Sequence, residues 1–134
     1  MEETGASTTG NQERRRMHRI AVSRFVQVRA RGTIDGRLID LSLTGARVQH
    51  LGLLRPGYPC VLEFPVGLGR LILASHIVRS AVVGVERTAV GERHLKYESA
   101  LAFAEVTEEQ GAVLASIMDD LSRRADDAQS RVSP

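Results

Sequence analysis

The chain has 134 residues, of which 43% are hydrophobic and 25% charged, and its formal net charge is +2. This length predicts a single domain, and no apolar run approaches the roughly 20 residues that a membrane helix needs. The single cysteine, Cys60, excludes an internal disulfide, and the polar N-terminus lacks a signal-peptide pattern, so we expect a cytoplasmic protein without membrane insertion.

The chain starts with a polar tail that leads into an arginine-rich arm. Residues 1–12 are rich in Gly, Ser and Thr and predict a disordered tail. The arm, residues 13–19, carries four arginines, and no acidic residue separates Arg14 from Ile34. Arginine forms forked hydrogen bonds to phosphates and stacks on rings. We therefore expect this part of the chain to attract an anion.

Alternating apolar and polar residues predict a first strand over residues 20–31. Arg24 interrupts its apolar face, which indicates a bulge or the open end of a barrel. The sequence Ile34-Asp35-Gly36 predicts a tight turn, because Asp-Gly tolerates positive φ at low steric cost. A second strand is expected over residues 37–41.

The middle of the chain reads as further short strands separated by turn residues. Turn signals lie at 43–45, at 52–59 around Pro56-Gly57, and at 67–69. Residues 81–87 either extend the fifth strand or form an irregular connection. The expected third to sixth strands cover residues 46–51, 60–64, 71–79 and 95–103.

The C-terminal part predicts one amphipathic helix. Thr107 and Gln110 have the spacing of a capping box at its start. An apolar stripe at helical spacing then predicts packing against the sheet or against a second protomer. We expect the helix to cover about residues 107–124, with a frayed tail at 125–134. The stripe consists of Leu114, Ile117, Met118 and Leu121.

Six strands and one helix predict a mainly β fold. The expected architecture is a small antiparallel six-stranded Greek-key-like barrel with one C-terminal α-helix. Its domain should cover residues 13–124, including the arm at 13–19 and the helix.

Catalytic motifs are missing from the sequence. The four histidines are isolated, and neither a Gly-x-Ser-x-Gly elbow nor a glycine-rich phosphate loop is present. Adjacent carboxylates at Asp119-Asp120 point in different directions on a helix and predict a solvated surface. We therefore expect a protein that is not an enzyme, with no catalytic residue, metal site or cofactor.

Two short motifs carry the candidate chemistry. Residues 15–19 have the spacing Arg-x-x-x-Arg before the first strand, and residues 40–45 form Asp-x-Ser-x-x-Gly after the second. Each motif alone is a weak signal, because arginines near a terminus usually form a solvated arm. The two expected strands run antiparallel, so both motifs are predicted on one surface of the barrel.

In these motifs and in its barrel-plus-helix pattern, the sequence resembles the PilZ domain family of cytoplasmic bacterial receptors for cyclic di-GMP. The resemblance covers most of the chain, from residue 13 to the helix near Thr107. It implies cyclic di-GMP as the ligand. The implied ligand-binding residues are Arg15 and Arg19 on phosphate and guanine, Asp40, Ser42 and Gly45 around a guanine base, and Arg14 as a further candidate.

Arginine suits such a ligand because its fork fits both a phosphate and the O6/N7 edge of guanine. An aspartate such as Asp40 can accept from the N1–H and N2–H₂ edge of guanine. Gly45 permits positive φ and close backbone approach. The run of three arginines leaves the register open, and the spacing to Arg19 selects Arg15 over Arg14.

We expect ligand binding to fold residues 13–19 over the mouth of the barrel and so to alter a surface for an unidentified protein partner or a second protomer, as in a homodimer. One alternative is a PilZ-like interaction module of a motility or secretion system that binds no nucleotide, which the complete motifs disfavour. Another is a barrel that binds nucleic acid. The aromatic content of 4% offers few stacking platforms and disfavours it.

Overall fold

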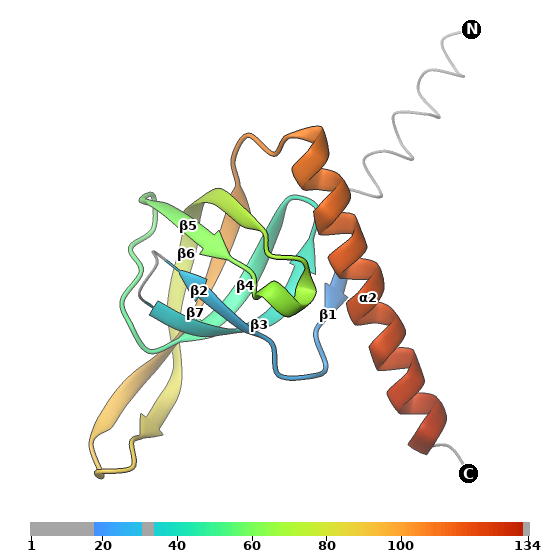
Figure 1. The fold of residues 1–134 in the computed structure, drawn as a ribbon. Coiled ribbons are helices and arrows are strands. Elements are labelled where there is room, and N and C mark those ends of the chain that lie inside the picture. The colour runs from blue at the N-terminus through green and yellow to red at the C-terminus, as the bar shows by residue number, and fades with distance from the viewer. Residues whose placement is uncertain (1–17, 31–33, 133–134) are drawn as a thin grey trace, which may run out of the picture.

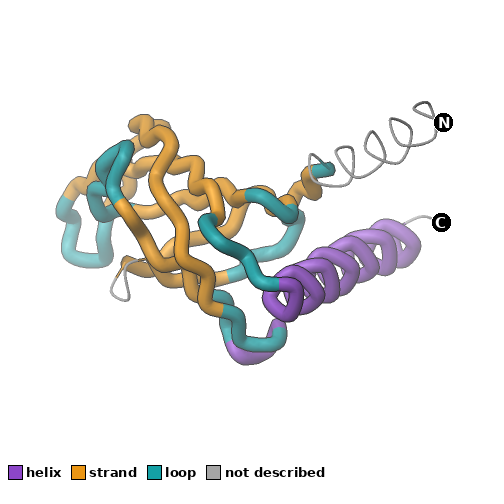
Figure 2. The backbone as a smooth tube through the Cα atoms, turned by 90° about the horizontal axis from the view of Figure 1, so that it is seen from above, coloured by secondary structure: helices purple, strands orange, loops and turns teal. Residues whose placement is uncertain are grey.

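A computed structural model of the chain describes residues 18–30 and 34–132, with side chains up to residue 123. Within these residues, one antiparallel sheet curls into a partly closed barrel, and a long helix lies along one side of it (Figures 1 and 2). The strands are β1 (Arg19–Ala21), β2 (Gln27–Ala30), β3 (Ile34–Ser42), β4 (Gly45–His50), β5 (Pro59–Glu63), β6 (Ile72–Arg87) and β7 (Arg93–Phe103).

The order of the strands explains the barrel. The sheet runs β1-β3-β2-β5-β6-β7-β4, and a further pairing of β4 with β3 brings six of these strands into a ring. β2 and β5 are joined by only two residue pairs, so the ring is only partly closed. The mainly β fold with a six-stranded barrel and a C-terminal helix is therefore confirmed, with β1 as a seventh strand at the edge of β3.

The expected first strand is split into β1 and β2. Both pieces pair with β3, because β1 lies opposite residues 40–42 and β2 opposite residues 34–37. Two backbone hydrogen bonds of 2.9 Å, from Val22 N to Ile39 O and from Leu38 N to Val26 O, hold the intervening segment beside β3. Arg24, the residue that interrupts the apolar face, is exposed within this break.

The predicted turn at Ile34-Asp35-Gly36 is wrong, because these residues begin β3. Gly36 lies opposite Val28 on β2 and His50 on β4. A Cβ at this position would come within 2.5 Å of Val48 Cγ1 and 3.0 Å of Gln49 O. Gly36 is therefore required by close packing against β4 and not by a positive φ.

β6 and β7 form a long two-stranded ribbon. Residues 81–87 continue β6 without interruption, so they extend the strand and do not form an irregular connection. The far half of the ribbon projects beyond the barrel, as its yellow and tan segments show in Figure 1. The chain thus carries an extension that the barrel itself does not need.

Helix α2 (Glu108–Val132) covers one end of the sheet. The capping box is confirmed, since Gln110 N donates to Thr107 Oγ1 and Thr107 N donates to Gln110 Oε1, both at 3.1 Å. The predicted stripe is buried in one cluster with Leu68 of the 3₁₀ helix Val66–Leu68. The helix continues past the end expected near residue 124. None of the described helices has the length and apolar character to span a membrane.

A buried histidine joins the end of β4 to the base of the ribbon. His50 is only 2% exposed, and its Nδ1 lies 2.5 Å from Gly52 O while its Nε2 lies 2.7 Å from Ser99 Oγ. Because a carbonyl only accepts, Nδ1 carries the proton and Nε2 accepts from the Ser99 hydroxyl. Ser99 Oγ lies 2.9 Å from Ser80 Oγ, which extends the network to β6. Burial lowers the pKa of His50, although its hydrogen bond to Gly52 opposes that shift.

This network predicts a pH dependence of stability. The pKa of His50 in the folded state lies below the unperturbed value of about 6.5, so the unfolded chain takes up the proton first as the pH falls. The free energy of unfolding should therefore decrease as the pH falls below about 6.5. Urea denaturation of wild type and of His50→Gln across this range measures the effect. The variant should lose part of the pH dependence, and identical pH profiles would contradict the assignment.

Candidate ligand-binding site

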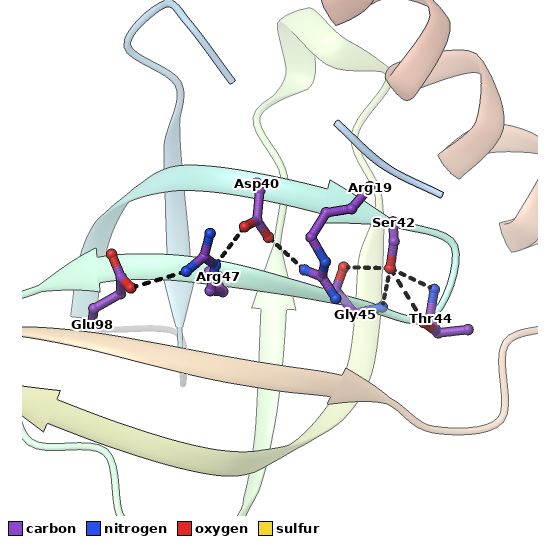
Figure 3. Close-up of polar contacts among 7 residues, drawn as sticks. All are labelled: Arg19, Asp40, Ser42, Thr44, Gly45, Arg47 and Glu98. Atoms are coloured by element: carbon purple, nitrogen blue, oxygen red, sulfur yellow. Dashed lines mark hydrogen bonds and ion pairs between the residues drawn. The ribbon is translucent and has the colours of Figure 1, made fainter. Parts of the chain in front are cut away.

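The two sequence motifs meet at Asp40. Arg19 opens β1 opposite Ser42, and Asp40 lies two pairs further along, opposite Ala21. The Arg19 Nη1 group donates to Asp40 Oδ1 (Figure 3). The side chain of Asp40 is 4% exposed, whereas that of Arg19 is 43% exposed. A buried carboxylate thus holds the last arginine of the arm against the barrel.

Arg47 is a second partner of Asp40 that sequence reasoning missed. Its Nε donates to the other carboxylate oxygen, Oδ2, and its Nη1 lies 3.5 Å from Glu98 Oε2 on β7. The hydrogen bond to Asp40 is the main cause that raises the pKa of Arg47 above its ordinary value. Gln49 Nε2 donates to the other oxygen of Glu98 at 3.2 Å. A chain of charged groups therefore crosses β1, β3, β4 and β7.

The position of Arg47 depends on a shift in the β3–β4 register that cannot be recognised in the sequence. Arg47 lies directly opposite Asp40, because the β3–β4 register shifts between Leu38 and Asp40. Uninterrupted pairing from Leu38 opposite Val48 would instead have placed Ile39 opposite Arg47. The sequence itself shows only that Arg47 follows Gly45 by two residues.

A hollow of about 440 Å³ lies on the outer face beside these arginines. Arg47, Ala100 and Arg79 lie side by side across β4, β7 and β6. Gly45 pairs with Ala102 in the neighbouring row, so small residues form part of the lining. The hollow therefore combines a low surface of small residues with three guanidinium groups, from Arg19, Arg47 and Arg79.

Ser42 shapes the turn between β3 and β4. Its side chain is fully buried, and its Oγ accepts from Thr44 N at 3.2 Å and from Gly45 N at 3.1 Å. The same hydroxyl lies 3.3 Å from Gly45 O and 3.2 Å from Thr44 Oγ1, which offers its proton an acceptor (Figure 3). These contacts close the turn on itself. The predicted contact of Ser42 with a base remains a prediction.

Gly45 is required by strand packing. Gly45 does not use the positive φ that a glycine permits, because the glycines with positive φ in the described residues are Gly57, Gly69 and Gly91. A Cβ on Gly45 would lie 2.3 Å from Leu101 O on β7. The close approach expected at this glycine is therefore the approach of a neighbouring strand.

Comparison with known proteins identifies the fold. The family model described as PilZ domain matches residues 13–120 of the chain. The chain belongs to the PilZ domain family. The PilZ domain of YcgR from Escherichia coli, solved with c-di-GMP, is similar with a TM-score of 0.68 at 19% identity, over 89% of this chain and 99% of that one.

Two larger proteins contain a similar PilZ fold. MrkH of K. pneumonia in its apo state gives a TM-score of 0.60 at 14% identity, over 83% of this chain and 50% of that one. YcgR from Escherichia coli in complex with c-di-GMP gives 0.58 at 21% identity, over 90% of this chain and 51% of that one. This chain thus spans about half the length of these two proteins. Curated protein sequences give no match.

The PilZ match begins at residue 13 and so includes the arginine-rich arm. Arg14 and Arg15 lie outside the residues that the structure describes, and their contacts remain predictions. Among the described side chains, no group of three or more His, Cys, Asp or Glu residues is placed to hold a metal ion.

The packing of Gly45 gives a stability prediction for this PilZ domain. Gly45→Ala should lower the free energy of unfolding by about 1–3 kcal/mol, because β4 and β7 must separate to admit the methyl group. Gly67→Ala is the matched control, since a Cβ at Gly67 meets no heavy atom within 4 Å. Chemical denaturation of both variants measures the difference. A Gly45→Ala protein as stable as the Gly67→Ala protein would contradict the packing argument.

Proposed function

We propose that this PilZ domain is a cyclic di-GMP receptor that binds its ligand on the outer face beside Asp40. The observation that carries the proposal is the carboxylate of Asp40 held between Arg19 and Arg47, two arginines that line a hollow. Membership of the family supports it, as do two similar structures whose ligand is c-di-GMP.

The hollow suits the chemistry of a cyclic dinucleotide. Its low wall at Gly45, Ala100 and Ala102 leaves room for a flat purine ring against the sheet. A guanidinium binds a phosphate, or the O6/N7 edge of guanine, through paired N–H donors. Arg19 and Arg47 are each about two-fifths exposed, so their N–H groups are within reach of a ligand.

Asp40 has two roles in this proposal. Its two oxygens position the guanidinium groups of Arg19 and Arg47 before the ligand arrives. Each carboxylate oxygen can accept more than one hydrogen bond. Because the Asp40 side chain is only 4% exposed, it can accept from the N1–H and N2–H₂ groups of a guanine once one of the two arginines turns toward the ligand.

The arginine-rich arm completes the proposed site. Arg15 lies four residues before Arg19, and Arg19 fixes the point at which the arm meets the barrel. We infer that the ligand draws residues 13–19 against the barrel, with Arg15 or Arg14 on a phosphate. This movement would alter the surface offered to a protein partner or a second protomer. The receptor acts in the cytoplasm and performs no catalytic step.

Calorimetry with cyclic di-GMP and with GTP tests the proposal. Wild type should bind cyclic di-GMP at micromolar concentrations and prefer it to GTP. Arg15→Ala and Arg19→Ala should each weaken binding about tenfold or more, because each removes charge-assisted hydrogen bonds to the ligand.

Arg29→Ala is the matched control for these variants. It removes an exposed arginine of β2 that pairs with Asp35 at 3.4 Å and lines a different hollow. Its affinity for cyclic di-GMP should equal that of wild type. Absence of binding by wild type, or unchanged binding by Arg15→Ala, would refute the proposal.

A further inference from the structure

The outer edge of β6 is unpaired where the ribbon leaves the barrel. Pairing of β5 with β6 ends at Pro59 opposite His76. Ile77 then makes two more backbone hydrogen bonds, from its N to Tyr58 O at 3.0 Å and from Gly57 N to its O at 2.7 Å. Beyond this point, β6 pairs only with β7 within the described part of the chain. An exposed strand edge presents unpaired N–H and C=O groups that can pair with another strand.

The ribbon has one apolar and one polar face. Residues opposite each other in antiparallel strands share a face. Val82 lies opposite Tyr97 and Val85 opposite Leu95, on the face that continues the barrel interior. Val82, Val85 and Leu95 are 54%, 58% and 49% exposed. Solvent therefore reaches an apolar strip at the free edge.

A bulge at Val83 determines which side chains of β6 lie on the polar face of the ribbon. The β6–β7 register shifts between Val82 and Gly84, so one extra residue enters β6 there. Residues seven apart in a regular strand lie on opposite faces, because side chains alternate with period two. The extra residue brings Arg79 and Glu86 onto the same, polar face. Both side chains are exposed.

This arrangement makes the edge complementary to itself. We propose that β6 pairs edge to edge with β6 of a second copy of this chain, about a two-fold axis through the bulge at Val82-Val83. That axis places Arg79 of one protomer opposite the partner's Glu86, and repeats the same pair in reverse. The same axis places Val82 of each copy opposite the partner's Val83.

The turn at the tip of the ribbon fits the same pairing. With Arg79 opposite the partner's Glu86, pairing can continue as far as Val78, because Ile77 is already bonded to Gly57 and Tyr58, and the partner's turn at residues 88–92 then abuts the end of β5. A hollow of about 480 Å³ lies there, with Leu53 and Tyr58 in its lining. Val90 in the turn is 81% exposed, and Leu53 and Tyr58 are 51% and 58% exposed. The proposed pairing therefore brings the exposed Val90 beside this hollow twice in the dimer.

The charge pattern selects a second copy as the occupant. An unrelated strand would need an acidic residue opposite Arg79 and a basic residue opposite Glu86. A second copy related by the two-fold axis supplies both. The inference goes beyond the proposed ligand binding and does not depend on it, because it rests on the edge of β6 alone.

Sedimentation equilibrium of the full chain without nucleotide tests the proposal. Wild type should show concentration-dependent association to twice the 14.6 kDa mass of one chain. Glu86→Arg and Arg79→Glu should each raise the dimer dissociation constant about tenfold or more, since each places like charges opposite one another twice. The double variant Arg79→Glu/Glu86→Arg should restore dimerisation.

Asp119→Arg is the control, because it makes a charge reversal like that of Glu86→Arg at an exposed position of α2. It should dimerise like wild type. Circular dichroism verifies that every variant is folded. A wild type that stays monomeric, a Glu86→Arg protein that dimerises unchanged, or a folded double variant without recovery would each overturn the proposal.

Discussion

The structure around the candidate site depends on one buried carboxylate. Burying a charge without partners is strongly unfavourable, so the fold around Asp40 is stable only if cations accompany it. Arg19 and Arg47 supply them from β1 and β4, on either side of β3. The short strand β1, with only three residues, gains a fixed place on the sheet through this ion pair. The same contact brings the end of the arginine-rich arm to the barrel.

The ion pairs also link the site to the rest of the ring. Arg47 reaches Glu98 on β7, and β7 pairs along its full length with β6. The site and the projecting ribbon therefore share one strand pair. Arg79, which lines the hollow beside Arg47, is also the residue that we place opposite the partner's Glu86. Occupation of the site and association of two chains would thus act on the same side chain.

Much of the fold could be predicted from the sequence, because alternation of apolar residues and the capping box report local structure directly. The apolar face at Val22, Val26 and Val28 is buried as expected. The turn at Asp35-Gly36 was predicted wrongly, because a glycine occurs both in turns with positive φ and where two strands pack closely. Only the position of the neighbouring strand shows which of the two applies at Gly36. Arg47 was missed because a bulge in β3 sets its register, and bulges leave no clear mark in a single sequence.

The closed turn at Ser42 has a consequence for the thermodynamics of the ligand binding that we propose. Because its hydroxyl bonds to the backbone of Thr44 and Gly45, the conformational entropy of this turn is lost when the protein folds. The proposed ligand would not have to order this turn again, which would favour tight binding. The entropic cost of association then falls mainly on exposed side chains such as Arg19 and Arg47. Substitutions in the turn should accordingly appear as losses of folding stability, whereas substitutions of Arg19 or Arg47 should lower both the stability around Asp40 and the affinity of the proposed site.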